Sequence, residues 1–132
     1  MAGQPEHNDK PRGELTVRIS AMPGDTNANG DIFGGWVLSR MDQAGGIAGV
    51  ERARGRVVTI ALDGMKFIRP VRVGDVLEVF SEVESIGRTS MKIHVEAWVR
   101  RFQTHVQEKV TRSEEHTSEL QSLAYLVCRL LL

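Results

Sequence analysis

Hydrophobic and polar residues alternate along three stretches of the chain, and a fourth stretch is rich in valine and isoleucine, and both patterns predict β-strands. The predicted strands are Glu14–Ala21, Arg56–Phe67, Val76–Ile86 and Met91–Phe102. In the last of these strands every second residue is apolar, so one face of the strand is predicted to be buried and the other to be more exposed to solvent. The more exposed face carries Lys92, His94, Glu96, Trp98 and Arg100.

A single helix is predicted over Trp36–Arg54, which contains no proline and is followed by Gly55. The preceding segment, Met22–Gly35, is dense in glycine, asparagine and aspartate, and it is predicted to be a long, shaped loop. A strand, a helix and then several antiparallel strands predict an α+β fold in which one helix covers one face of a sheet.

The composition limits the chain to one globular domain. Its 132 residues, 41% hydrophobic and 26% charged, are enough for a single core. With 17 basic and 17 acidic residues, it has no surplus charge for binding nucleic acid or an anionic membrane. A single cysteine, Cys128, excludes an intramolecular disulfide and a cysteine-based metal site. The polar segment 1–12 lacks the apolar centre of a signal peptide, so we expect a disordered tail on a cytoplasmic protein.

Asp42 is the unusual charge on the predicted helix, because it lies in a stripe of small residues without a basic residue three or four positions away. The residues within about 60° of it around the helix are Gly35, Leu38, Ser39, Gly45, Gly46 and Gly49. Each interior glycine costs about 0.5–1 kcal/mol relative to alanine, so the stripe needs a reason. It either receives a ligand, with Asp42 as a general base or nucleophile, or permits a tight crossing while Asp42 faces solvent. The spacing supports both interpretations equally.

Gly34 and Gly35 stand at the start of this helix, where free backbone N–H groups can stabilise an oxyanion. Alternatively, Asn29, Gly30 and Asp31 only cap the helix. From the residues alone, capping is the stronger interpretation.

Four blocks of the sequence together resemble the YciA-type acyl-CoA thioesterases, which have the hotdog fold. The blocks are Asp25–Trp36, Ser39–Gly49, Gly55–Leu77 and Gly87–Arg101, and the likeness extends over residues 15–111. The resemblance implies hydrolysis of acyl-CoA to free CoA and a carboxylic acid, as in fatty acid metabolism. No cofactor is implied, since CoA is part of the substrate. It also implies a hotdog domain over residues 13–111, whose sheet wraps around the helix and whose copies form dimers and then homohexamers.

The same resemblance assigns the reacting groups. Asp42 matches the catalytic carboxylate, and Asn27 matches the asparagine that faces the aspartate of a neighbouring subunit. Gly35 matches the residue whose N–H polarises the thioester carbonyl, with Gly34 beside it in substrate binding. Each active site would therefore be shared between two subunits. The resemblance also implies that the acyl and pantetheine groups bind along the glycine stripe.

The CoA phosphates are expected, again by resemblance, at Lys66 and Arg69 and at the turn formed by Arg88, Thr89 and Ser90. An isolated basic residue such as Arg69 or Arg88 is more often simply solvated. Thr59 would touch the attacking water or fill the core, and the core is the simpler interpretation.

Two other functions fit parts of the pattern. A hotdog module that binds acyl-CoA without turnover could use the same groove, although the presence of Asp42 argues against it. A dehydratase acting on 3-hydroxyacyl thioesters would need a histidine near the helix, whereas His94 and His105 belong to late strands.

The segment after Thr111 differs in kind, because the family continues with another alternating strand and this chain does not. Arg112–Ser122 and Leu126–Leu132 resemble the translated halves of a common sequencing adapter, with a three-residue index between them. We therefore expect residues 112–132 to be a non-native tail and the last strand of the sheet to be missing. Two strand edges would then lack partners, so the chain is expected to aggregate or to lose its oligomer and not to form an active assembly.

Overall fold

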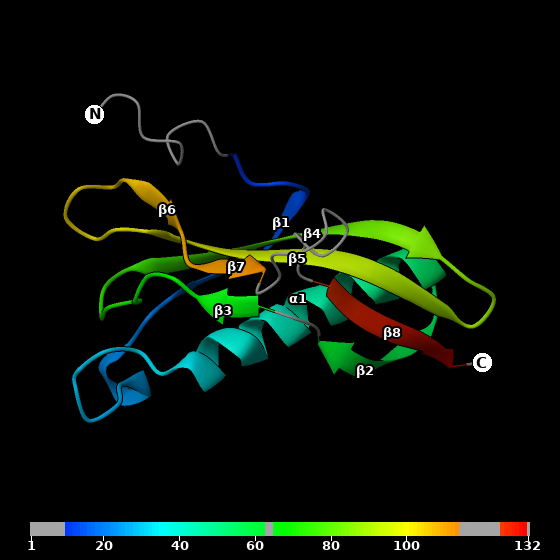
Figure 1. Ribbon diagram of the computed structural model, residues 1–132, viewed down its shortest axis with the longest axis horizontal. Coiled ribbons are helices and arrows are strands. Elements are labelled where there is room, and N and C mark those ends of the chain that lie inside the picture. Colours follow the sequence, from blue (N-terminus) through cyan, green and yellow to red (C-terminus); the bar gives the residue numbers. More distant parts are fainter. Residues whose placement is uncertain (1–9, 63–64, 114–124, 132) are drawn as a thin grey trace.

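The computed structural model describes residues 10–62, 65–113 and 125–131. One long helix, α1 (Gly34–Ala53), runs beside an antiparallel sheet, and a 3-10 turn, η2 (Pro23–Asp25), precedes it (Figure 1). The strands are β1 (Glu14–Ser20), β2 (Arg56–Leu62), β3 (Met65–Phe67), β4 (Val76–Ile86), β5 (Ser90–Arg100), β6 (Gln107–Lys109), β7 (Thr111–Ser113) and β8 (Tyr125–Leu131). Among the residues described, no helix has the length and apolar character needed to cross a membrane.

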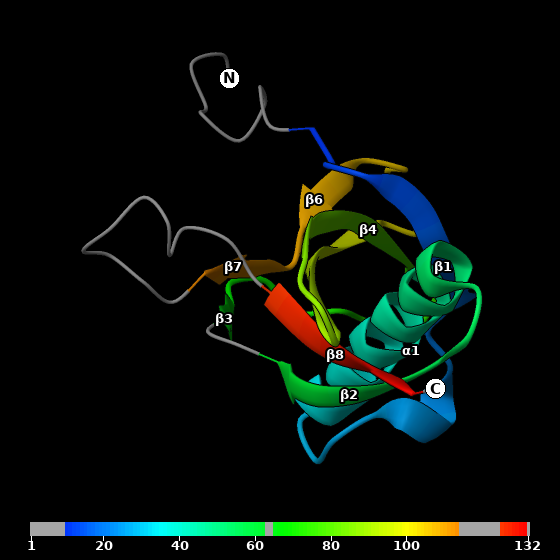
Figure 2. The ribbon, with the colours of Figure 1, turned by 90° about the vertical axis from the view of Figure 1, so that its right-hand side faces the viewer.

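The main sheet has the strand order β1-β4-β5-β8-β2, and β6 pairs with one end of β5. Every pair of neighbours is antiparallel. The short strands β3 and β7 form a separate two-stranded sheet. Seen from its end, the main sheet curves around α1 (Figure 2). The predicted α+β arrangement, with one helix covering one face of a sheet, is confirmed.

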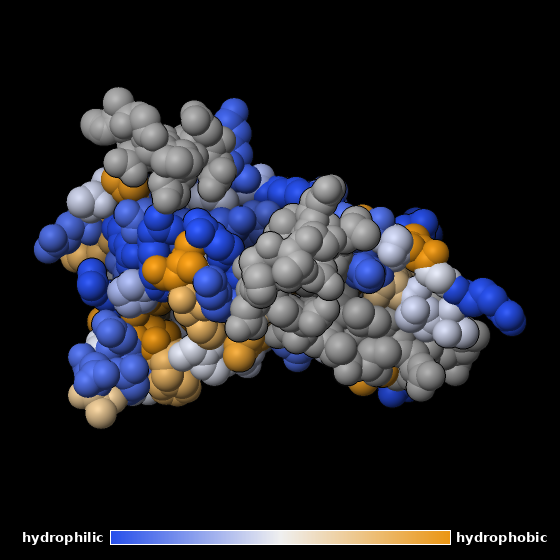
Figure 3. Space-filling model, in the orientation of Figure 1, coloured by the Kyte–Doolittle hydropathy of each residue, from blue (hydrophilic) through white to orange (hydrophobic). Residues whose placement is uncertain are grey.

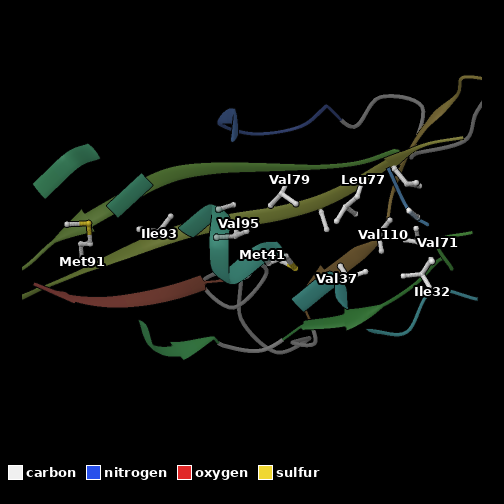
Figure 4. Packing of buried hydrophobic residues seen from close by; sticks show 14 residues of the cluster. Ile32, Val37, Met41, Val71, Leu77, Val79, Met91, Ile93, Val95 and Val110 are labelled. Atoms are coloured by element: carbon white, nitrogen blue, oxygen red, sulfur yellow. The ribbon is translucent and has the colours of Figure 1, made fainter. Parts of the chain in front are cut away.

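The hydrophobic core lies between α1 and the main sheet (Figure 4). At its centre Met41 of the helix is fully buried among Leu77 and Val79 of β4 and Ile93 and Val95 of β5. Burial of each such side chain contributes about 1.5–3 kcal/mol, which fixes the helix on the sheet. One side of α1 therefore belongs to the core, and the opposite side remains exposed.

Two predicted elements have different bounds in the structure. The helix begins at Gly34, two residues before its predicted start. The predicted strand Arg56–Phe67 is divided into β2 and β3, which belong to different sheets. Both pieces are apolar enough to be strands, so the residue pattern does not reveal where the chain leaves one sheet for another.

The last position of the main sheet is filled, so the prediction of a missing strand is wrong. The strand β8 lies between β5 and β2 and pairs with both of them. Its register sets Leu126 opposite Ile93 on one side and Cys128 opposite Thr59 on the other. Strand pairing uses backbone groups that every residue except proline carries, so a segment of any origin can supply it. Residues 114–124 and 132 of the predicted tail lie outside the described residues.

The face of β5 that was predicted to be more exposed to solvent is partly buried, because His94, Glu96 and Trp98 on it are buried. Glu96 accepts hydrogen bonds from His94 Nε2 at 2.6 Å and from Trp98 Nε1 at 2.8 Å. Lys109 of β6 places its Nζ 4.0 Å from the same carboxylate. Both oxygens of Glu96 are hydrogen-bonded, which lowers the cost of burying its charge, whereas His94 Nδ1 has no hydrogen-bond partner among the described residues. Alternation along one strand does not reveal such a cluster.

The predicted N-terminal tail ends before residue 12. Its residues 1–9 lie outside the described residues, whereas Arg12 is held against the sheet. The Arg12 backbone N–H donates to Glu96 Oε1 at 3.2 Å, and its guanidinium pairs with Glu82 and Glu84. Arg12 thus covers part of the buried polar cluster on β5.

Candidate active site

The start of α1 has free backbone N–H groups. Its N-cap residue is Phe33, whose side chain makes no capping hydrogen bond, so the expected capping by Asn29, Gly30 or Asp31 is wrong. The Trp36 N–H donates to the Phe33 carbonyl at 3.0 Å. Within the described part of the chain, the N–H groups of Gly34 and Gly35 have no acceptor. They are therefore available to an oxygen that gains negative charge.

Asn27 shapes the loop in front of the helix. Its Oδ1 accepts hydrogen bonds from the backbone N–H groups of Asn29, at 2.8 Å, and Asp31, at 3.1 Å. The backbone N–H of Asn27 in turn donates to the Asp31 carbonyl at 2.7 Å. Gly30 has a φ of 86° in this turn, a conformation that favours glycine. The loop is thereby folded by its own residues, which leaves the helix start uncapped.

A pocket of about 200 Å³ lies at the start of the helix. It is lined by Asn27, Asp31, Ile32, Gly34, Val37, Phe67, Arg69, Pro70, Val71 and Val110. On the face shown in Figure 3, hydrophobic surface lies among hydrophilic residues at the end of the molecule where α1 begins. The pocket thus joins three of the predicted site residues, Asn27, Gly34 and Arg69, which the chain brings from three different segments.

Arg69 is the basic residue of this pocket. It is half-buried, and its Nη1 donates to the backbone carbonyl of Lys109 at 2.8 Å. Lys66, the other basic residue expected near it, is exposed on β3.

Asp42 lies apart from the pocket, on the exposed side of α1. Among the residues that the structure describes, it has neither a hydrogen bond nor an ion pair. Nearby Arg40 is engaged elsewhere, because it donates to Gln43 Oε1 at 3.0 Å and lies 5.9 Å from the centre of the Trp36 ring. The carboxylate is therefore unpaired, as the spacing predicts, but the chain alone does not desolvate it.

Gly35 and Asp42 face the same side of the helix two turns apart, which is about 10 Å along its axis. Reacting atoms must approach to about 3–3.5 Å. One thioester carbonyl cannot be held against the Gly35 N–H and attacked from Asp42 of the same chain over that distance. Gly35 and Asp42 of one chain therefore do not act on the same carbonyl.

The glycine stripe beside Asp42 serves two purposes rather than one. Gly49 is buried against the sheet, where an added Cβ would lie 3.3 Å from Val57 Cγ2 and 3.6 Å from Ile93 Cδ1. At Gly46 an added Cβ would meet nothing within 4 Å. The inner part of the stripe permits the tight helix–sheet crossing, and only the outer part is open to a ligand or another chain.

The remaining predicted site residues are not gathered at the pocket. Arg88, Thr89 and Ser90 belong to the turn between β4 and β5, closed by a 2.7 Å hydrogen bond from the Gly87 N–H to the Ser90 carbonyl. This turn follows the last residue of β4, whereas the helix start lies near the first residue of β4 (Figure 1). Eleven residues of strand span about 33 Å. Thr59 is half-buried on β2 and lies on the same face as Val57, which favours the core interpretation.

Phe67 was not identified as a site residue from the sequence. Its ring lies against Gly34, where an added Cβ would be only 2.8 Å from Phe67 Cε2. An apolar residue in a predicted strand carries no signal that distinguishes it from the core. Only the chain reversal that places β3 beside the helix start makes it a pocket residue.

Comparison with known proteins adds to this geometry. Residues 29–101 match the model of the thioesterase superfamily. The acyl-CoA thioester hydrolase YciA of Salmonella typhimurium is 52% identical over 94 residues, which are 71% of either chain. The hexameric thioesterase y2039 of Yersinia pestis superimposes with a TM-score of 0.80 at 41% identity, covering 93% of this chain and 91% of that one.

The hexameric broad-specificity acyl-coenzyme A thioesterase HI0827 superimposes with a TM-score of 0.82 at 39% identity, over 96% of this chain and 80% of that one. These likenesses confirm the expected hotdog fold. The family match spans more than half of the chain, from the loop of Asn29 through the helix to the end of β5. The chain therefore belongs to the thioesterase superfamily.

Proposed function

We propose that the protein hydrolyses acyl-CoA thioesters to free CoA and a carboxylic acid. The observation that carries the proposal is an unpaired carboxylate, Asp42, on the helix whose uncapped start opens into a pocket. The relatives named above, which include an acyl-CoA thioester hydrolase 52% identical to this chain, support the same reaction. The chemistry requires no cofactor, because the substrate carries its own CoA.

The reaction needs few protein groups, since a thiolate is a good leaving group and no strong acid is required to expel it. The Gly35 N–H, with Gly34 beside it, stabilises the charge that develops on the carbonyl oxygen. Asp42 acts either as the general base that activates water or as the nucleophile that forms a mixed anhydride. In both cases the acyl C–S bond breaks, CoA leaves as the thiol, and water supplies the new hydroxyl of the acid.

The complete site is formed between two copies of the chain. Asn27 and Gly35 of one copy are joined by Asp42 of its neighbour, because the helix separates Gly35 from Asp42 within one copy. The exposed apolar residues Ile47 and Val50 follow Asp42 on the open side of the helix, where a second copy can cover them. By similarity to the hexameric thioesterases, we expect dimers assembled as a trimer.

The CoA phosphates are held by basic groups from more than one segment. Lys66 and Arg69 are near the pocket, and Arg88, Thr89 and Ser90 form an exposed turn at the far end of β4. In one chain these groups cannot meet a single CoA. In an assembly, the turn of one copy supplies the contacts that another copy's pocket lacks.

The proposal is tested with Asp42→Asn and a matched control, Glu51→Gln, which changes an exposed carboxylate of the same helix. Release of CoA thiol from acyl-CoA is expected to fall by about 10²–10⁴-fold in Asp42→Asn and to be unchanged in Glu51→Gln. Circular dichroism should give the same folded spectrum for both. Undiminished turnover in Asp42→Asn would refute the assignment.

The second candidate function is binding of acyl-CoA without hydrolysis, which the same pocket permits. Wild-type protein that binds acyl-CoA but releases no thiol would establish it. Addition of water to an enoyl thioester would indicate a dehydratase instead. That reaction is disfavoured because His94 is buried on the face of β5 away from the helix, and His105 is exposed in the turn after β5.

A further inference from the structure

Four large apolar side chains are exposed on loops at the end of the molecule where α1 begins (Figure 1). They are Met22 in the loop after β1, Val73 in the turn before β4, and Phe102 and Val106 in the hairpin between β5 and β6. We call these four residues the apolar end. Neighbouring exposed apolar side chains on a folded protein mark a surface that another molecule covers.

Hydrogen bonds hold the three segments of the apolar end together. The buried Asp75 carboxylate accepts from the Phe102 N–H at 2.9 Å and from Arg101 Nη1 at 2.8 Å. The Asp75 carbonyl accepts from the Ala21 N–H at 2.9 Å, and the Gly74 N–H donates to the Ala21 carbonyl at 2.9 Å. The backbone that presents the apolar side chains is therefore fixed, so a partner that binds there has few loops to order.

A hollow of about 440 Å³ lies beside Phe102. Val73 and Phe102 form part of its wall, together with Arg72 and Glu108. Phe102 packs on Gly74, where an added Cβ would lie 3.3 Å from Phe102 Cγ, yet its side chain remains 64% exposed. An exposed ring next to a hollow is typical of interface anchors, which seat a large side chain of one partner in a pocket of the other.

The charged groups around the apolar end have both signs. Arg72 Nε lies 4.0 Å from Asp31 Oδ1, and Arg101 Nε lies 2.8 Å from Glu108 Oε1. Such a rim has no surplus charge that would select a nucleic acid or an anionic membrane. An apolar centre with a mixed polar rim is typical of a contact with protein, and a second copy of this chain brings the same balance of charges.

An assembly larger than a dimer requires a second contact surface on each chain. A contact between two identical patches closes after two copies. The open side of α1, with Ile47 and Val50, serves the two copies that share an active site in the proposed function. Six copies therefore need another surface, and the apolar end holds Phe102, the most exposed of the large hydrophobic residues in the described part of the chain.

We propose that the apolar end is the surface through which dimers of this chain join into a hexamer, with Phe102 of one copy packed against the apolar end of the next. This inference rests on the assembly given under the proposed function. Every junction of a closed assembly uses the same residues, so the loss of one anchor weakens all junctions at once.

Sedimentation velocity of the full chain over a range of protein concentrations tests the proposal. The wild type should sediment as a hexamer. Phe102→Ser and Val106→Ser should sediment as dimers, a threefold loss of mass, because each places a polar group at the contact. The matched control is Ile86→Ser at the last residue of β4, where the side chain is 46% exposed against 50% for Val106. It should remain a hexamer.

Each outcome decides for or against the apolar end. A folded Phe102→Ser or Val106→Ser that remains hexameric would overturn it. Dimers of Ile86→Ser would overturn it as well, because exposed apolar area in general would then hold the copies together. So would a dimeric wild type, and its flotation with phosphatidylcholine vesicles would assign the apolar end to lipid. Circular dichroism checks folding, and Val106→Ser leaves the contact between Phe102 and Gly74 in place.

Release of CoA thiol from acyl-CoA, measured on the same samples, tests the proposed function separately. A hexameric wild type that releases no thiol would refute hydrolysis and leave the apolar end assigned. A wild type that releases thiol but sediments as a dimer would overturn the apolar end and leave hydrolysis supported.

Discussion

Replacement of Glu96 by glutamine tests whether the buried polar cluster on β5 stabilises the fold. The carboxylate is 9% exposed and accepts hydrogen bonds from His94, Trp98 and the backbone of Arg12. Glutamine has nearly the same shape but no charge, and only one of its two terminal atoms accepts. The His94 contact then survives only if the imidazole changes tautomer and accepts from the new amide, and the remaining hydrogen bonds lose the charge of their acceptor.

The expected loss is about 2–3 kcal/mol in the free energy of unfolding. Hydrogen bonds to a charged group contribute about 1.5–3 kcal/mol, against about 1 kcal/mol for neutral ones, and an unsatisfied buried donor costs about 1–3 kcal/mol. This corresponds to a change of about 30- to 160-fold in the unfolding equilibrium constant. The matched control is Glu82→Gln, at a side chain that is 42% exposed and pairs with Arg12. An exposed pair of that kind contributes only about 0.2–1 kcal/mol.

The pH dependence has a definite sign. Burial alone would raise the pKa of Glu96, but the hydrogen bonds from His94 and Trp98 and the charge of Lys109 outweigh it and lower the pKa below its ordinary value. Stability from Glu96 is therefore complete above the unfolded pKa of about 4.3 and is lost as the pH falls through the lower folded pKa. Glu78 acts in the same direction: burial opposes its ionisation, and hydrogen bonds from Arg18 and Gln107 with the charge of Arg100 lower its pKa.

Urea unfolding of wild type, Glu96→Gln and Glu82→Gln from pH 3 to pH 7, at one protein concentration, measures these effects. The difference between wild type and Glu96→Gln should be largest near neutral pH and should shrink below about pH 4. A loss in Glu96→Gln no larger than in Glu82→Gln, or a difference that grows in acid, would refute the reasoning.

Three further predictions concern the core, the helix start and the last strand. Met41→Ala should lose about 2–5 kcal/mol of stability in urea unfolding, because Met41 is fully buried, whereas exposed Met22→Ala should lose almost none. Gly34→Ala should place a methyl group against the ring of Phe67, and a double-mutant cycle with Phe67→Ala should measure a coupling of about 0.5–3 kcal/mol between the two positions. Deletion of Tyr125–Leu131 should unpair the edges of β2 and β5 and give aggregates on size-exclusion chromatography, where an unchanged soluble oligomer would contradict the expectation.

The origin of the segment after Thr111 remains a prediction that a different measurement checks. Sequencing the gene across the codon for Thr111 should reveal a frame that continues into an alternating strand. That strand would occupy the position of β8 between β5 and β2. A genomic sequence that encodes Arg112–Leu132 as written would instead make β8 the protein's own last strand.

The sequence by itself determined the elements that depend on local pattern. Alternation identified β1, β4 and β5 within two residues at either end, and the absence of proline with a following glycine identified the helix. It also identified Asp42 as a carboxylate without a helical partner. These properties depend on neighbours along the chain, so they can be predicted without knowing which helices and strands pack against one another.

Only the tertiary structure decided which surfaces are covered and which residues meet. It divided Arg56–Phe67 between two sheets. It buried His94 and Glu96 on a face of β5 that was expected to be exposed to solvent. It also placed the ring of Phe67 against Gly34. Each of these outcomes depends on contacts between segments distant in sequence, and periodicity along one segment contains no information about its partner.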